Sequence, residues 1–144
     1  MKQLIELAIE EAKNIKIHAT SKEKNNLNLR TFDGSRSNKC IYGQMTENCY
    51  NKRATELITK CCERVYYADS FSQLPSIDSA EINGTPSKMT RYVGKGLPGE
   101  RLPSHSTHYS PIEVLVQNDY YNGMMDYAGE IISFIKDETK ILEL

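Results

Sequence analysis

Apolar residues recur at three- and four-residue steps in three stretches of this chain, and that spacing is the period of an amphipathic helix. It predicts helices over residues 2–17, about 50–67 and about 120–141. The expected buried faces comprise Leu4, Ile5, Ala8, Ala12 and Ile15 in the first helix, Tyr50, Ala54, Leu57, Ile58, Cys61, Val65 and Tyr66 in the second, and Tyr121, Met124, Met125, Ala128, Ile131, Ile132 and Ile135 in the last. We therefore predict a mainly α fold, a compact helical domain, with a mixed α+β fold as the alternative.

Two short strings have the pattern of a helix start. In Thr20-Ser21-Lys22-Glu23 and in Ser110-Pro111-Ile112-Glu113, a hydroxyl precedes a glutamate by three positions, which is the spacing of a capping box. In the second string, proline occupies the first helical position, where its missing N–H has no partner to lose. The strings predict two short helices, over about 21–26 and from 111 to about 117.

Residues 68–104 interrupt the helical pattern. The prolines of this segment are Pro75, Pro86, Pro98 and Pro103, and glycines are frequent between them. We predict a long loop or irregular insertion over 68–104, inside a single domain that spans 1–144. The strings 39–42 and 89–93 each have the composition of a brief strand, so a small β element is expected from the middle of the chain.

Charge and hydropathy exclude several classes of protein. The 18 basic and 19 acidic residues give a net charge of -1, so neither the basic field of a nucleic-acid-binding protein nor the acidic excess of a DNA mimic is present. No apolar run is long enough to cross a bilayer, and Glu6 falls within the first apolar stretch, where a secretory signal would be uncharged. We expect a cytoplasmic protein with no membrane partner, in which the four cysteines are thiols.

Cations, hydroxyls and glycines gather just before the second capping box. The segment 88–108 has one acidic residue, Glu100, and its glycines expose backbone amides. Amides at a helix start, together with nearby hydroxyls and cations, are typical of an anion site. The residues that we expect to bind an anion or a partner are Lys88, Arg91, Lys95, Arg101, His105 and Ser110.

Two His-x-Thr triplets, His18-Ala19-Thr20 and His105-Ser106-Thr107, resemble the signature of the two-histidine phosphoesterases. The resemblance implies that His18 and His105 act as general acid and base while Thr20 and Thr107 hold a phosphate. That family places both triplets on strands, whereas here Thr20 fits a helix cap and His105 lies in a serine- and proline-rich stretch. We therefore predict no catalytic residue, with a phosphodiesterase as the alternative.

Neither a metal nor a cofactor is expected. The cysteines, even with His105 and His108, lack the two-to-four-residue ligand spacing of zinc sites. Basic residues and tyrosines do alternate along one part of the chain, which would suit weak nucleic-acid binding by stacking and phosphate contacts. They are Arg30, Arg36, Lys39, Tyr42, Tyr50, Lys52 and Arg53.

The strings CIYGQMTENC, at 40–49, and RATELI, at 53–58, resemble small uncharacterised proteins of gut bacteria and their phages. The resemblance implies a setting, the host cell cytoplasm, in which short proteins neutralise a host factor. We predict a non-enzymatic phage-type binding protein that inhibits a host defence component, such as an anti-CRISPR protein, or that sequesters a phosphorylated signal molecule as a nucleotide sponge. A structural or packing protein is a further alternative, and a homo-oligomer is left open.

Overall fold

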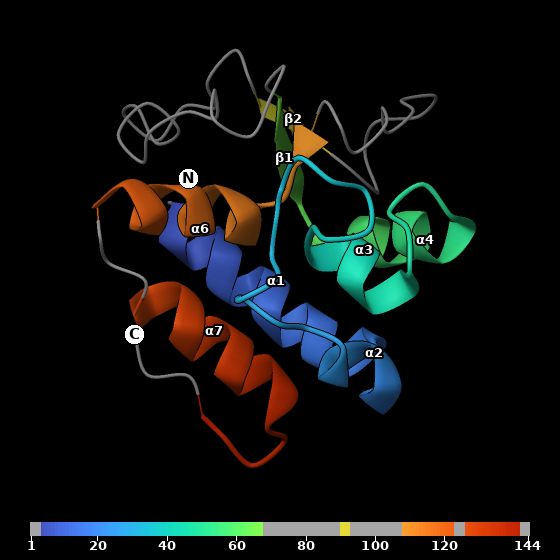
Figure 1. Ribbon diagram of the computed structural model, residues 1–144, viewed down its shortest axis with the longest axis horizontal. Coiled ribbons are helices and arrows are strands. Elements are labelled where there is room, and N and C mark those ends of the chain that lie inside the picture. The colour runs from blue at the N-terminus through green and yellow to red at the C-terminus, as the bar shows by residue number, and fades with distance from the viewer. Residues whose placement is uncertain (1–3, 68–89, 93–107, 123–125, 142–144) are drawn as a thin grey trace.

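A computed structural model of the chain describes residues 4–67, 90–92, 108–122 and 126–141 (Figure 1). Most of these residues are helical, so the mainly α prediction is confirmed. The elements in chain order are α1 (Leu4–His18), α2 (Ser21–Asn25), α3 (Ile41–Thr46), α4 (Lys52–Cys61), β1 (Arg64–Tyr67), β2 (Thr90–Tyr92), β3 (His108–Tyr109), α6 (Pro111–Asn122) and α7 (Asp126–Lys136).

Helix α1 lies in the middle of the molecule, with α6 and α7 on one side and α3 and α4 on the other (Figure 1). Its predicted apolar face is confirmed, because Leu4, Ala8, Ala12 and Ile15 are all buried. Ala8, Ala12 and Ile15 join residues of α3, α4, α6 and α7 in one hydrophobic cluster, and Ile5 packs against it. Glu11 is buried on the same face, with no exposed surface, although a charge was not expected there.

The first capping box forms as predicted and joins α2 to α4. The Thr20 hydroxyl accepts from the Glu23 amide at 3.1 Å, and Glu23 Oε1 accepts from the Thr20 amide at 2.8 Å. The Arg53 guanidinium donates to both oxygens of Glu23, each at 2.9 Å. This hydrogen-bonded ion pair holds the pKa of Glu23 below its usual value.

The predicted helix over 50–67 is wrong beyond Cys61. Helix α4 ends there, Cys62 is extended, and Arg64–Tyr67 forms the central strand of an antiparallel sheet with the order β2-β1-β3. Val65 pairs with Arg91, and Tyr66 pairs with Thr90 on one side and Tyr109 on the other. β-branched and aromatic residues favour strands, and the two sheet partners come from distant parts of the chain. The predicted small β element and the strand over 89–93 are confirmed within Thr90–Tyr92.

The predicted strand over 39–42 is wrong, because Ile41 begins helix α3. Cys40 takes the place of a hydroxyl residue as the N-cap, and its Sγ accepts from the Gly43 amide at 3.4 Å. Cysteine is not among the usual N-cap residues, so the sequence pattern contained no recognisable start signal. A helix at this position also brings the backbone of Gly43 against the backbone of Ser37.

The C-terminal helices divide at a different place from the one predicted. Helix α6 continues past residue 117 to Asn122, and α7 ends at Lys136 rather than near residue 141. Ala128, Ile131, Ile132 and Ile135 are buried as expected. The side chains of Tyr121, Met124 and Met125 lie outside the described residues.

None of the helices in the described ranges is both long and apolar enough to span a membrane.

Candidate functional site

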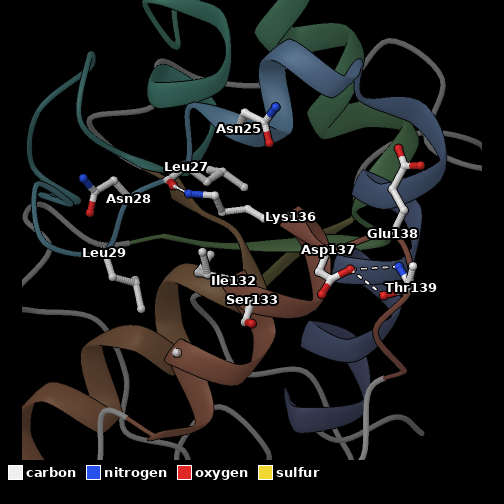
Figure 2. Close-up of a pocket in the computed structure, with 11 residues that line it drawn as sticks. Asn25, Leu27, Asn28, Leu29, Ile132, Ser133, Lys136, Asp137, Glu138 and Thr139 are labelled. Carbon is white, nitrogen blue, oxygen red and sulfur yellow. Dashed lines mark hydrogen bonds between the residues drawn. The ribbon is translucent and has the colours of Figure 1, made fainter.

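A groove of about 700 Å³ runs between α7 and the chain that leaves α2. Figure 2 shows Leu27, Leu29 and Ile132 beside it, with polar side chains around them. Leu27, Leu29 and Ile132 are the large apolar residues of the groove; Leu27 and Ile132 are buried, and Leu29 is partly exposed. The residues that line the groove are Asn25, Leu27, Asn28, Leu29, Gly129, Ile132, Ser133, Lys136, Asp137, Glu138 and Thr139.

Hydrogen bonds across the groove fix its two walls relative to each other. Lys136 Nζ donates to the Leu27 carbonyl at 2.8 Å, which ties α7 to the residues that follow α2. Lys24 Nζ donates to Glu138 Oε1 at 3.2 Å, so the turn after α7 is also tied to α2. These two hydrogen bonds hold α7 and the turn after it against α2 and the residues that follow α2. The groove between them is therefore a fixed feature of the folded chain.

The far end of the groove is the turn after α7, and Lys16 of α1 holds that turn. Lys16 Nζ donates to the carbonyls of Asp137 at 2.8 Å and Lys140 at 3.0 Å, and lies 4.0 Å from the centre of the Phe134 ring. The Asp137 carboxylate accepts from the hydroxyl and the amide of Thr139. These hydrogen bonds lower the pKa of Asp137. Lys136, Asp137 and Glu138 therefore all have hydrogen-bond partners within the chain.

A second cluster of polar side chains lies inside the molecule, where α1, α3 and the start of α6 meet. Glu11 Oε1 accepts from the Ile112 amide at 2.8 Å. Glu113 is also fully buried, and its oxygens accept from the amides of Ser110 at 3.0 Å and Ile41 at 3.3 Å. We call Glu11 and Glu113 the acid joint, because the two carboxylates connect three helices through backbone amides.

Tyr42 and Cys62 extend the acid joint toward α3 and the end of α4. The Tyr42 hydroxyl donates to Glu11 Oε2 at 2.5 Å and lies 3.2 Å from Cys62 Sγ. Burial raises the pKa of both Tyr42 and Cys62 well above their usual values. Cys62 is therefore a protonated thiol at neutral pH, which makes it a poor nucleophile.

The second capping box forms as predicted, and it occupies the amides that we expected an external anion to use. The Ser110 hydroxyl accepts from the Glu113 amide at 3.3 Å, while Glu113 accepts from the Ser110 amide. With the Ile112 amide bonded to Glu11, these donors at the start of α6 already have carboxylate or hydroxyl partners. The chain's own acids take the place of the expected ligand.

The remaining residues of the predicted anion site cannot be placed together. Arg91 belongs to β2, where only its backbone is described. Lys88, Lys95, Arg101 and His105 lie outside the described residues, as does the predicted loop over 68–104 apart from Thr90–Tyr92. Their expected role in anion binding stays a prediction.

Of the two His-x-Thr triplets that resemble a phosphoesterase signature, the structure describes the first, His18-Ala19-Thr20. His18 is exposed at the end of α1, and its carbonyl accepts from Arg53 at 3.0 Å. Thr20 caps α2 with the hydroxyl that would otherwise hold a phosphate. His105 and Thr107 lie outside the described residues, so whether the two histidines face each other stays untested.

The cysteines Cys40, Cys49, Cys61 and Cys62 are all buried, free thiols. Within the described ranges, no three of the chain's cysteine, histidine and acidic side chains form a group that could hold a metal ion. The predicted basic and tyrosine-rich surface is not continuous, because Tyr42 is in the core and Arg53 is paired with Glu23. Arg36 also lies 3.5 Å from an oxygen of Asp33.

Sequence reasoning missed the acid joint and the groove. One feature of the sequence does indicate the acid joint. Glu11 lies three residues after Ala8 and four before Ile15, so the helical period places it on the apolar face of α1. The groove left no such signal, since it depends on how the segment 25–29 crosses α7.

Comparison of the chain with protein-family models, curated proteins and solved structures finds no match in any of the three.

Proposed function

We propose that this chain is a non-enzymatic binding protein whose groove between residues 25–29 and α7 receives an apolar side chain of a protein partner. The single observation that carries the proposal is the contrast between the floor and the rim of the groove. Leu29 exposes apolar surface above the buried Leu27 and Ile132, while the charged groups around it are bonded within the chain. Binding sites commonly combine an apolar pocket with a few polar groups around it.

The charges of the groove favour a protein partner over a phosphorylated small molecule. Among the described residues that line it, Lys136 is the cation, and its ammonium group already donates to the Leu27 carbonyl. Asp137 and Glu138 add negative charge beside it. A phosphate here would meet two carboxylates and one occupied ammonium, whereas an aliphatic or aromatic side chain would lose water from apolar surface on both partners.

The biological role that we propose is inhibition of a host defence component by occupying one of its surfaces. The resemblance of residues 40–49 and 53–58 to small proteins of gut bacteria and their phages supports this role. Inhibition by contact needs no catalytic group, and the buried Glu11, Cys62 and Tyr42 have partners inside the fold. Sequestration of a phosphorylated signal molecule by the segment 88–108 is the competing form of the same proposal.

Gly129 gives a direct test, because it lines the groove and a Cβ built on it meets no atom within 4 Å. We expect Gly129→Arg to fill the groove and to weaken partner binding at least tenfold. Gly129→Ala should bind normally, and it should raise the free energy of unfolding by about 0.5–1 kcal/mol, because alanine is the better helix former. The partner is first isolated with the wild-type chain from candidate host cells, and its Kd is then measured for all three chains.

The matched control keeps the position and changes only the size of the side chain. If Gly129→Arg keeps its thermal midpoint and binds the partner as tightly as Gly129→Ala does, the groove is not the binding surface. Titration with cyclic and linear nucleotides tests the alternative, in which the segment 88–108 sequesters a phosphorylated signal molecule. Nucleotide binding that is unchanged by Gly129→Arg and lost in Arg91→Ala/Arg101→Ala would favour the segment 88–108 instead.

A further inference from the structure

We propose that the acid joint of Glu11 and Glu113 is a pH-sensitive connection, which holds α1 to the start of α6 while Glu11 carries a proton and loosens when Glu11 ionises. The joint is separate from the groove and does not depend on the proposed binding partner. It rests on the positions of the two carboxylates and on what surrounds them.

The two carboxylates are held at neighbouring amides of the same helix start. Glu11 reaches the Ile112 amide from α1, while Glu113 folds back onto the Ser110 amide, two residues earlier. Glu113 also accepts from the Ile41 amide at the start of α3. Neither side chain has exposed surface, so water cannot screen one carboxylate from the other.

The groups that face Glu11 come from three neighbouring parts of the fold. The Tyr42 hydroxyl of α3 donates to Oε2 of the ionised Glu11; when Oε2 carries the proton, the Tyr42 oxygen accepts it and the hydroxyl turns to Cys62 Sγ. Ser110 and Glu113 come from the start of α6, and the thiols of Cys61 and Cys62 lie at the end of α4. Each of these two thiols has a raised pKa, to which both burial and the charge of Glu11 contribute.

Among the side chains that the structure describes in α4 and α7, which also pack on α1, the charged groups are exposed or paired with another residue. In α7, Glu130 and Lys136 are exposed, and Lys136 is bonded to the Leu27 carbonyl. In α4, Arg53 is paired with Glu23, and Lys60 is exposed. Glu11 therefore titrates in surroundings dominated by burial, hydrogen bonds and a second carboxylate.

Burial raises the pKa of Glu11 from 4.5 to about 7, with a further contribution from the charge of Glu113, against the hydrogen bonds from Tyr42, Ile112 and Ser110. Between these two values the unfolded chain loses the Glu11 proton while the folded chain keeps it. The unfolding equilibrium constant should therefore rise about tenfold per pH unit from near 5 to near 7, and then level off. Below 4.5 the proton is bound in both states, so this loss of stability is absent.

Ionisation of Glu11 should weaken the contacts of strand β3 as well as those at the start of α6. Strand β3 directly precedes Ser110, and its residues pair with Tyr66 and Tyr67 of β1. Hydrogen exchange of the Ile112 amide reports on the joint itself, because that amide is bonded to Glu11. The amide of Ile58, which lies in α4, serves as an internal reference.

Glu11→Gln is the variant that isolates the carboxyl proton. The glutamine carbonyl can still accept from the Ile112 amide, and its NH₂ group can donate to the Tyr42 oxygen, whose hydroxyl can turn to Cys62 Sγ at 3.2 Å. We expect the wild-type unfolding constant to rise about tenfold per pH unit relative to that of Glu11→Gln between pH 5 and 6.5. Protection of Ile112 relative to Ile58, corrected for intrinsic exchange, should fall from pH 6 to pH 8 in the wild type alone.

Tyr42→Phe supplies an independent readout if Glu11→Gln does not fold. It removes the hydroxyl that stabilises the Glu11 carboxylate. The pH at which half of the Glu11 side chains are ionised should therefore rise. Carboxyl-carbon NMR measures that midpoint directly in the wild type and in Tyr42→Phe. A Glu11 midpoint near 4.5, or a pH dependence of stability that is the same in the wild type and Glu11→Gln, would overturn the proposal.

Discussion

Gly43→Ala should lower the free energy of unfolding by about 3 kcal/mol or more, which is at or above the upper end for inserting one methyl group into a packed site. A Cβ at Gly43 would lie 2.0 Å from the carbonyl oxygen of Ser37, so the backbone of α3 or of the preceding loop must move. The loop cannot retreat freely, because the same carbonyl accepts from the Cys49 amide at 2.8 Å. Urea denaturation of both chains measures the difference.

Gly129→Ala is the matched control, since it makes the same chemical change inside another helix. Alanine is favoured over glycine in helices by about 1 kcal/mol, and at Gly129 nothing opposes that preference. The two substitutions should therefore have opposite signs. Stabilisation by Gly43→Ala would show that α3 does not pack with its backbone against Ser37.

Glu113→Ala should lower the free energy of unfolding by about 3 kcal/mol. It leaves two buried amide donors, those of Ser110 and Ile41, without their carboxylate acceptor, and each unsatisfied buried group costs roughly 1–3 kcal/mol. The loss should be smaller for Glu113→Gln, whose single carbonyl oxygen can still serve one of the two amides. Thermal or urea denaturation at a fixed pH below 4.5, where Glu11 is protonated in both the folded and the unfolded chain, separates this effect from the ionisation of Glu11.

Ser110→Ala is the comparison for the other half of the same capping box. The hydroxyl serves one amide, that of Glu113, so its loss should cost about 1 kcal/mol, the usual figure for an N-cap. Equal losses for Ser110→Ala and Glu113→Ala would mean that Glu113 acts only as part of the capping box. The connection to α3 through the Ile41 amide would then contribute nothing measurable.

Local sequence signals predicted the parts of the fold that are determined locally. The spacing of Leu4, Ala8, Ala12 and Ile15 identified the buried face of α1 because a helix repeats every 3.6 residues whatever surrounds it. The two capping boxes identified the starts of α2 and α6 because their hydrogen bonds join residues three positions apart.

The parts that failed depend on contacts between distant residues. Val65 and Tyr66 continue the apolar period of α4, and only their pairing with Arg91, Thr90 and Tyr109 makes them a strand. Cys40 caps α3 although thiols are not typical caps. Of the candidate site, Ser110 was correctly expected at a helix start, but its amide is bonded to Glu113 rather than left for a ligand.

Photo-crosslinking from inside the groove tests the proposed binding surface most directly. A benzophenone amino acid placed at exposed Ser133 of α7 is compared with one at exposed Thr59 of α4, a helix that contributes no residue to the groove. We predict that the probe at Ser133 captures one host protein, and that adding Gly129→Arg abolishes the capture. Capture of that protein from Thr59 and not from Ser133 would contradict the assignment of the groove as the partner's site.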